Sequence, residues 1–156
     1  MIGLFALVAV STAGCPTERA HYVLRGRPDI TAYFQAVESG KDWPSHLALA
    51  IRSSNTGRTT WWVPWQGGTD GRTNIASTTD VTRRDWRPPN PDGGPRPLGD
   101  RQFLTTDASY NVIEGVPQRG KAAPAHMLNP EAGASRYAIF PVKQFFDFVS
   151  CARDGR

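Results

Sequence analysis

Large apolar residues alternate most regularly with small or polar ones in the segment HLALAIR, from His46 to Arg52. Alternation with a period of two is typical of a half-buried β-strand. A polar stretch, SNTG, follows, and then a second strand-like segment, RTTWWVPW, which ends at Trp65. Two such segments joined by a short turn predict a β-hairpin. A three-residue loop that Gly57 closes in the left-handed conformation fits this turn.

The length of that loop sets the register of the predicted hairpin. Large apolar residues then face one another on one side of the sheet, in the pairs Ile51–Trp61, Leu49–Val63 and Leu47–Trp65. The other side carries Arg52, and it places Trp62 opposite the small side chain of Ala50. Because the two faces of a strand differ consistently in this register, it predicts Trp61 and Trp65 in the core and Trp62 exposed.

The rest of the chain is expected to form short strands separated by turns. The strand candidates are residues 21–26, 29–39, 101–107, 110–115, 135–142 and 142–151, with one more strand after the polar segment GGTDGRT. Residues 29–39 and 142–151 also fit a short helix. With 15 Gly and 13 Pro in 156 residues, the sequence predicts a mostly β protein. We expect a single-domain β-sandwich or small barrel with long Pro/Gly-rich loops, spanning residues 15–156.

Prolines and glycines are densest between Arg87 and Asp100, in RPPNPDGGPRPLGD. Such a segment can be an interdomain linker or a long, stiffened surface loop. The pieces of chain on either side are short for independent domains, which favours the loop. Trp43 and Trp86 flank turns, and we expect them to anchor loops on the core.

The N-terminus begins with an uncharged run from Ile2 to Gly14 that is too short to span a membrane as a helix. It matches the apolar part of a signal peptide, predicted here as residues 1–14. The segment STAGC resembles the lipobox of bacterial lipoproteins, which implies a lipid anchor on Cys15. Cleavage after Ala13 by an ordinary signal peptidase and a buried first strand are the alternatives. Export to the periplasm, free or anchored to a membrane by lipid, is the expected localisation.

The chain has two cysteines, Cys15 and Cys151, near its opposite ends. If Cys15 carries a lipid or is removed with the signal peptide, Cys151 has no partner within the chain. If Cys15 is retained in an oxidising compartment, a disulfide with Cys151 closes a long loop. In the chain-entropy model this adds about 4–5 kcal/mol of stability.

Charge and motifs exclude several classes of function. The net charge of the protein is only +4, and the Lys and Arg residues are scattered along the chain. Nucleic-acid-binding proteins usually cluster basic residues on one face, so no nucleic-acid binding is expected. No nucleophile, phosphate-binding or metal-binding motif occurs, and no cofactor or metal is predicted. His21, His46 and His126 lie far apart in the sequence and lack the spacing of metal ligands. An enzyme is therefore not the favoured interpretation.

The densest polar cluster follows the hairpin and supplies most of the candidate ligand-binding residues. These candidates are Trp62, Arg52, Asp70, Arg72, Asn74 and Asp80. An exposed Trp can stack on a sugar face while carboxylate, amide and guanidinium groups bind hydroxyls. Alternatively, the Asp and Asn side chains hydrogen-bond their own backbone in turns.

The sequence thus predicts an exported binding or accessory module of the cell envelope. A carbohydrate or peptidoglycan-like polymer is the expected ligand, and an envelope protein is an alternative partner. One rival is a small hydrolase that uses His126, an Asp and a Ser at a dispersed site. A structural or partner-binding lipoprotein is the other rival.

Overall fold

The computed structural model describes residues 12–67, 72–131 and 143–153. Within these ranges the chain forms β-strands and one short 3-10 turn, η1 (Thr17–Arg19), and no α-helix. The strands are β1 (Ala20–Leu24), β2 (Arg27–Ala36), β3 (Leu47–Ser53), β4 (Thr59–Gly67), β5 (Arg72–Thr78), β6 (Asp100–Gln102), β7 (Leu104–Thr106), β8 (His126–Leu128) and β9 (Phe146–Cys151).

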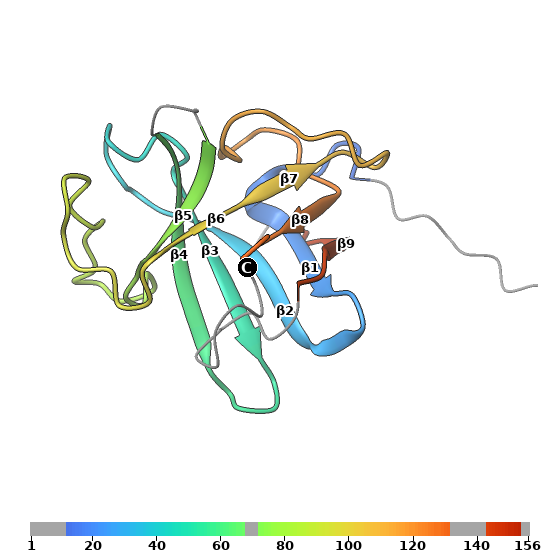
Figure 1. Ribbon diagram of the computed structural model, residues 1–156, viewed down its shortest axis with the longest axis horizontal. Coiled ribbons are helices and arrows are strands. Elements are labelled where there is room, and N and C mark those ends of the chain that lie inside the picture. Colours follow the sequence, from blue (N-terminus) through green and yellow to red (C-terminus); the bar gives the residue numbers. More distant parts are fainter. Residues whose placement is uncertain (1–11, 68–71, 132–142, 154–156) are drawn as a thin grey trace, which may run out of the picture.

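The described strands form one antiparallel sheet in the order β6-β5-β4-β3-β2-β1-β9-β8-β7. The two ends of this order, β6 and β7, are separated in sequence only by Phe103. They run as one line across the front of the sheet, which is nearly closed into a barrel (Figure 1). The predicted fold class, mostly β and either sandwich or small barrel, is confirmed.

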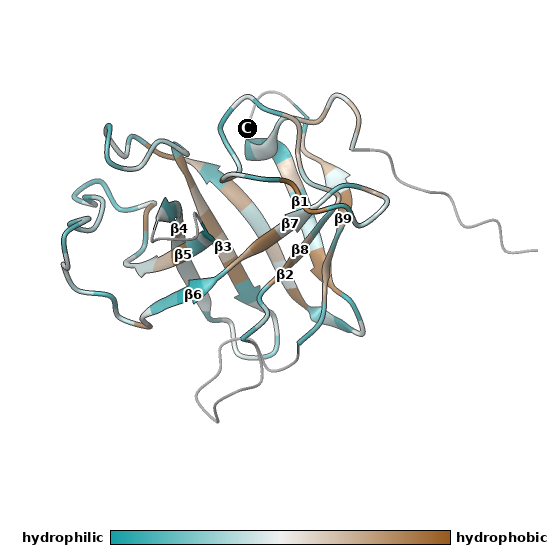
Figure 2. Ribbon diagram, turned by 45° about the horizontal axis from the view of Figure 1, so that its top comes forward, coloured by the Kyte–Doolittle hydropathy of each residue, from teal (hydrophilic) through white to brown (hydrophobic). Residues whose placement is uncertain are grey.

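The interior of the barrel is filled by apolar side chains from nearly every strand. Trp62 lies there with no exposed surface, among Leu47, Leu49 and Ile51 of β3. The outer face of β3 is also buried, because Ala48 and Ala50 pack with Trp61 against the partly buried Trp86. Hydrophobic residues concentrate on the strands, whereas β6 is hydrophilic along its length (Figure 2).

The β3–β4 hairpin is present, but its predicted register is wrong by one residue. Leu49 pairs with Trp62 and Ala50 with Trp61. The cause is a four-residue loop, since the Ser53 N–H donates to the Arg58 carbonyl at 2.9 Å. Every side chain of β4 is consequently on the opposite face from the one expected, because strand side chains alternate. Trp62 therefore points into the core.

Gly57 has φ +68°, so the predicted left-handed glycine at the end of the turn is confirmed. Residues 29–39 and 142–151 contribute strands β2 and β9 rather than helices. Residues 110–115 do not form the predicted strand and have only an isolated bridge between Thr106 and Val112. The candidate at 135–142 lies outside the described residues. The Pro-rich segment connects β5 and β6, which pair with each other, and so it is a loop within one sheet.

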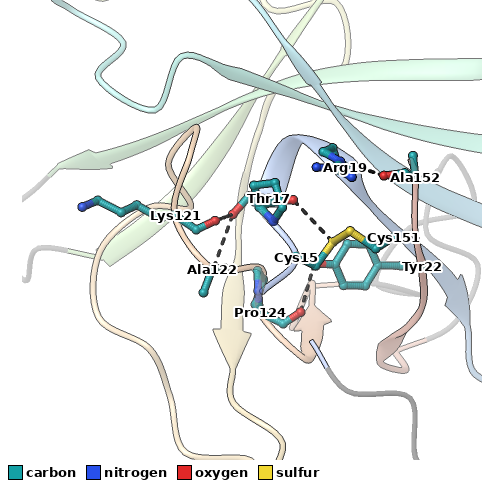
Figure 3. The surroundings of a disulfide bond; sticks show 10 residues. Cys15, Thr17, Arg19, Tyr22, Lys121, Ala122, Pro124, Cys151 and Ala152 are labelled. Carbon is teal, nitrogen blue, oxygen red and sulfur yellow. Dashed lines mark hydrogen bonds between the residues drawn. A yellow bond between two sulfur atoms is a disulfide. The ribbon is translucent and has the colours of Figure 1, made fainter. Parts of the chain in front are cut away.

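The two ends of the described chain are joined by a disulfide between Cys15 and Cys151, with Cα atoms 5.8 Å apart. Figure 3 shows the surrounding hydrogen bonds, in which the Thr17 hydroxyl donates to the Lys121 carbonyl at 2.9 Å. The Tyr22 hydroxyl likewise donates to the Pro124 carbonyl at 2.9 Å. Of the alternatives for Cys15, the structure contains the disulfide, and a sulfur so bonded carries no lipid. Residues 1–11 of the predicted signal peptide lie outside the described residues.

Candidate functional site

A cleft of about 950 Å³ opens where several loops meet at the end of β4. Its walls come from the turn 42–44, the Pro-rich loop at 91–96, the loop 113–118 and the segment 121–124. Trp65 and Gln66 of β4 and Thr105 of β7 also line it. Ligand sites in proteins commonly have volumes of about 300–1,000 Å³, so the cleft has the size of a binding site.

The turn between β2 and β3 holds two walls of this cleft in place. Trp43, only 3% exposed, donates its indole N–H to the Pro89 carbonyl at 3.0 Å and fixes the Pro-rich loop. Ser45 has no exposed surface and donates its hydroxyl to the Pro117 carbonyl at 2.6 Å. The Arg119 N–H donates to the Ser45 carbonyl at 3.0 Å. These hydrogen bonds fix the turn 42–45 to the two loops, and so they hold the walls of the cleft in position.

Arg96 stabilises the Pro-rich loop through hydrogen bonds to the backbone of the same loop. Its guanidinium lies 5.6 Å from the centre of the Trp43 ring and donates to the carbonyls of Asn90 at 2.9 Å and Gly94 at 3.1 Å. Asp100 completes the environment with a carboxylate oxygen 3.4 Å from Nε. Arg96 is therefore committed to the loop, whereas Asp42, Glu114 and Lys121 present exposed charges at the cleft.

Trp65 is the aromatic residue of β4 that reaches this cleft. It is half-buried, and its ring lies against the backbone of Gly67, where any Cβ would overlap it. Its indole nitrogen is buried and has no hydrogen-bond partner among the described residues. The sequence pattern assigned Trp65 to the core and Trp62 to the surface, and the one-residue shift of the register reverses the two roles.

The residues predicted as ligand-binding are not brought together. Arg52 pairs with Thr59 at one end of β4, whereas Arg72 pairs with Gly67 at the other end. Asp70 lies outside the described residues. Because Trp62 is fully buried in the barrel, its predicted exposure is wrong, and it offers no ring face to a sugar.

The side chains of Asp80 and Asn74 form hydrogen bonds with residues two positions away in the chain. The Asp80 carboxylate accepts from the Thr82 hydroxyl at 2.6 Å and from the Thr82 N–H at 2.9 Å. These bonds, first the one from the hydroxyl, lower the pKa of Asp80 below its usual range. Asn74 donates to the Arg72 carbonyl at 2.9 Å. The Asp80 contacts match the turn interpretation that the sequence left open, whereas Asn74 makes its contact from within strand β5.

A second polar cluster surrounds His126, outside the cleft. The His126 Nδ1 lies 2.7 Å from an Asp147 carboxylate oxygen, and Arg25 holds the same carboxylate with two hydrogen bonds of 2.8 and 2.7 Å. The Tyr110 ring stacks on His126 with centroids 4.2 Å apart, and its hydroxyl accepts from Arg25 at 2.6 Å. Phe145 packs against both rings. The cluster fixes the orientation of the imidazole.

Burial acts to raise the pKa of Asp147, but the hydrogen bonds from Arg25 and His126 outweigh it and hold that pKa below its usual range.

The His126 Nε2 has no hydrogen-bond partner among the described residues, and no hydroxyl or thiol there completes a catalytic triad. His21 stacks on Tyr33, and His46 lies 3.5 Å from the Ser39 hydroxyl.

Within the described ranges, no group of three or more His, Cys, Asp or Glu residues is placed to hold a metal ion. A search of the same ranges finds no helix with the length and hydropathy to cross a membrane.

The described chain is thus a nearly closed antiparallel barrel with a loop-walled cleft at one end. No protein-family model, curated protein or solved structure matches it.

Proposed function

We propose that this chain is an exported glycan-binding protein whose ligand lies in the cleft beside Trp65. The observation that carries the proposal is the half-buried Trp65 ring in a cleft of about 950 Å³. A tryptophan offers a flat apolar surface for the face of a sugar ring, and its polar edge hydrogen-bonds nearby oxygens.

The other residues of the cleft support a sugar ligand. Asp42, Glu114 and Gln118 are exposed and place carboxylate and amide groups around the opening. Carboxylates accept hydrogen bonds and amides both accept and donate them, so these groups can bind sugar hydroxyls. Ligand sites typically combine an apolar lining with a few polar groups that fix orientation, which is the composition here.

The disulfide supports the exported location. Bonds of this kind form and persist in oxidising compartments, including the bacterial periplasm, and are rare in the cytosol. Cys15 and Cys151 are the two cysteines of the chain, and both are used in this bond. The same bond favours a soluble exported protein over one anchored through a lipid on Cys15.

Binding to a panel of soluble oligosaccharides and insoluble polysaccharides, peptidoglycan included, tests the proposal. Trp65→Ala removes the ring from the cleft and is expected to abolish binding of any glycan that the wild-type protein retains. Trp86→Ala is the matched control, because Trp86 is also half-buried but does not line the cleft. Wild-type protein that binds no glycan, or equal loss in both variants, contradicts the proposal.

Hydrolysis is a second candidate function, favoured by the 2.7 Å contact between His126 and Asp147. A carboxylate that orients an imidazole is the arrangement of a general base, and here the base would act on water. His126→Ala is expected to abolish any hydrolysis of esters or glycosides by the wild-type protein. Activity that survives in this variant, or a wild-type protein without activity, removes this candidate.

A further inference from the structure

Resting on the proposed function, we infer that the cleft selects N-acetylated sugars, with the Trp65 indole N–H donating to the acetamido carbonyl. Three other tryptophan N–H groups have acceptors within the chain. Trp43 donates to the Pro89 carbonyl, Trp62 to the Thr60 hydroxyl and Trp86 to the Thr78 hydroxyl. Trp65 differs, since its Nε1 is buried and has no partner among the described residues.

A buried donor without an acceptor is unfavourable, and most buried polar groups in native proteins have a partner in the protein or in ordered water. Trp65 lines the cleft, so a ligand that enters beside the ring can bring the missing acceptor. The Nε1 atom exposes less than 1 Å². A ligand oxygen that bonds to it has to displace the atoms that cover it, so we expect the contact to require a group that inserts beside the ring.

An acetamido group combines the two features that would fit beside Trp65, a hydrogen-bond acceptor and a small apolar group. Its carbonyl oxygen is a strong acceptor, and it is neutral, so its burial does not require a charged partner. Its methyl group needs apolar surroundings, and the cleft supplies them at Pro44, Val116, Pro117 and Pro124. Removal of the acetyl group leaves an ammonium, which has neither the acceptor nor the methyl group.

The test compares three β-1,4-linked oligomers of equal length by titration calorimetry: N-acetylglucosamine, glucosamine and glucose. Wild-type protein is expected to bind the N-acetylated oligomer about tenfold more tightly than the other two, the effect of one hydrogen bond and a buried methyl group. Trp65→Phe keeps a ring in the cleft but removes the N–H. The smaller ring is expected to weaken binding of all three oligomers, and the loss for the N-acetylated oligomer is expected to be about fivefold greater than the loss for the glucose oligomer.

Trp86→Phe, which also removes one indole N–H, is the control and is expected to bind all three oligomers as the wild type does. Equal wild-type affinities for the three oligomers overturn the N-acetyl selectivity and leave glycan binding intact. A Trp65→Phe variant that keeps the full preference overturns the role of the N–H. Absence of binding to every glycan overturns both this inference and the proposed function.

Discussion

At the scale of single residues, Trp62 and Trp65 have opposite roles although they are close in sequence. Trp62 fills the barrel interior with no exposed surface, whereas Trp65 lines the cleft. A sequence can show that a strand is rich in tryptophan. Which ring is buried depends on the register, and one residue in the turn decides it.

Trp62→Ala is expected to lower the free energy of unfolding by about 3–5 kcal/mol, because it leaves a large cavity in the core. Urea unfolding with the disulfide intact measures the change. The control is Arg52→Ala on the neighbouring strand, where the side chain is exposed and the expected change is within about 0.5 kcal/mol. A loss below about 1 kcal/mol for Trp62→Ala contradicts the burial of this side chain in the barrel core.

Asp147 makes stability depend on pH. Its pKa is lower in the folded protein than in the unfolded chain, where Asp titrates near 3.9. The carboxylate thus stabilises the fold above that pH, and its contribution is lost as the pH falls through the folded-state pKa. The difference in unfolding free energy between wild type and Asp147→Asn is expected to shrink from about pH 5 to pH 2. A difference that stays constant over this range, measured by urea unfolding, contradicts the assignment.

At the scale of elements, the alternation of HLALAIR and the glycine after SNTG were sufficient to predict the β3–β4 hairpin. The exact loop length was not predictable, because three- and four-residue loops both suit Gly57. The strand predicted at residues 110–115 is not present. This segment is part of the connection between β7 and β8, and it forms only one bridge with β7. Their apolar residues Val112 and Ile113 are exposed instead of packed in the sheet.

Ser45→Ala is expected to loosen the wall formed by residues 113–118, because it removes the buried donor to the Pro117 carbonyl. We expect a loss of about 1–2 kcal/mol in unfolding free energy. Hydrogen exchange at the Arg119 amide, which donates to the Ser45 carbonyl, is expected to become faster. Ser54→Ala is the control, since that hydroxyl is exposed and bonds Asp29 outside the cleft. Exchange at Arg119 that is equal in both variants contradicts the role of Ser45.

At the scale of the whole molecule, the predicted fold class held because short alternating strands and frequent turns are a property of the entire chain. The cleft could not be predicted. Its walls come from segments near residues 43, 93, 115 and 122, and no spacing in the sequence relates them. Hydrogen bonds such as Ser45 to Pro117 join positions far apart in the chain and become visible only in three dimensions.

The disulfide acts on the whole molecule because the two cysteines are 136 residues apart. Cys15→Ser with Cys151→Ser is expected to lower the unfolding free energy by about 2–5 kcal/mol, through the greater freedom of the unfolded chain. Segment 121–124 both lines the cleft and contacts Thr17 and Tyr22 beside the disulfide, so ligand affinity is also expected to fall. Urea unfolding and calorimetry measure the two effects. Unchanged stability in the double variant contradicts the role of this bond.

Glycan binding beside Trp65 can be tested by a two-dimensional ¹H–¹⁵N NMR titration with an N-acetylglucosamine oligomer, followed at the indole N–H resonances of the five tryptophans. The Trp65 resonance is expected to shift and to reach saturation, while that of Trp62, which is buried inside the barrel, is expected to stay in place. A Trp65 resonance that does not move at high ligand concentration would contradict glycan binding in this cleft.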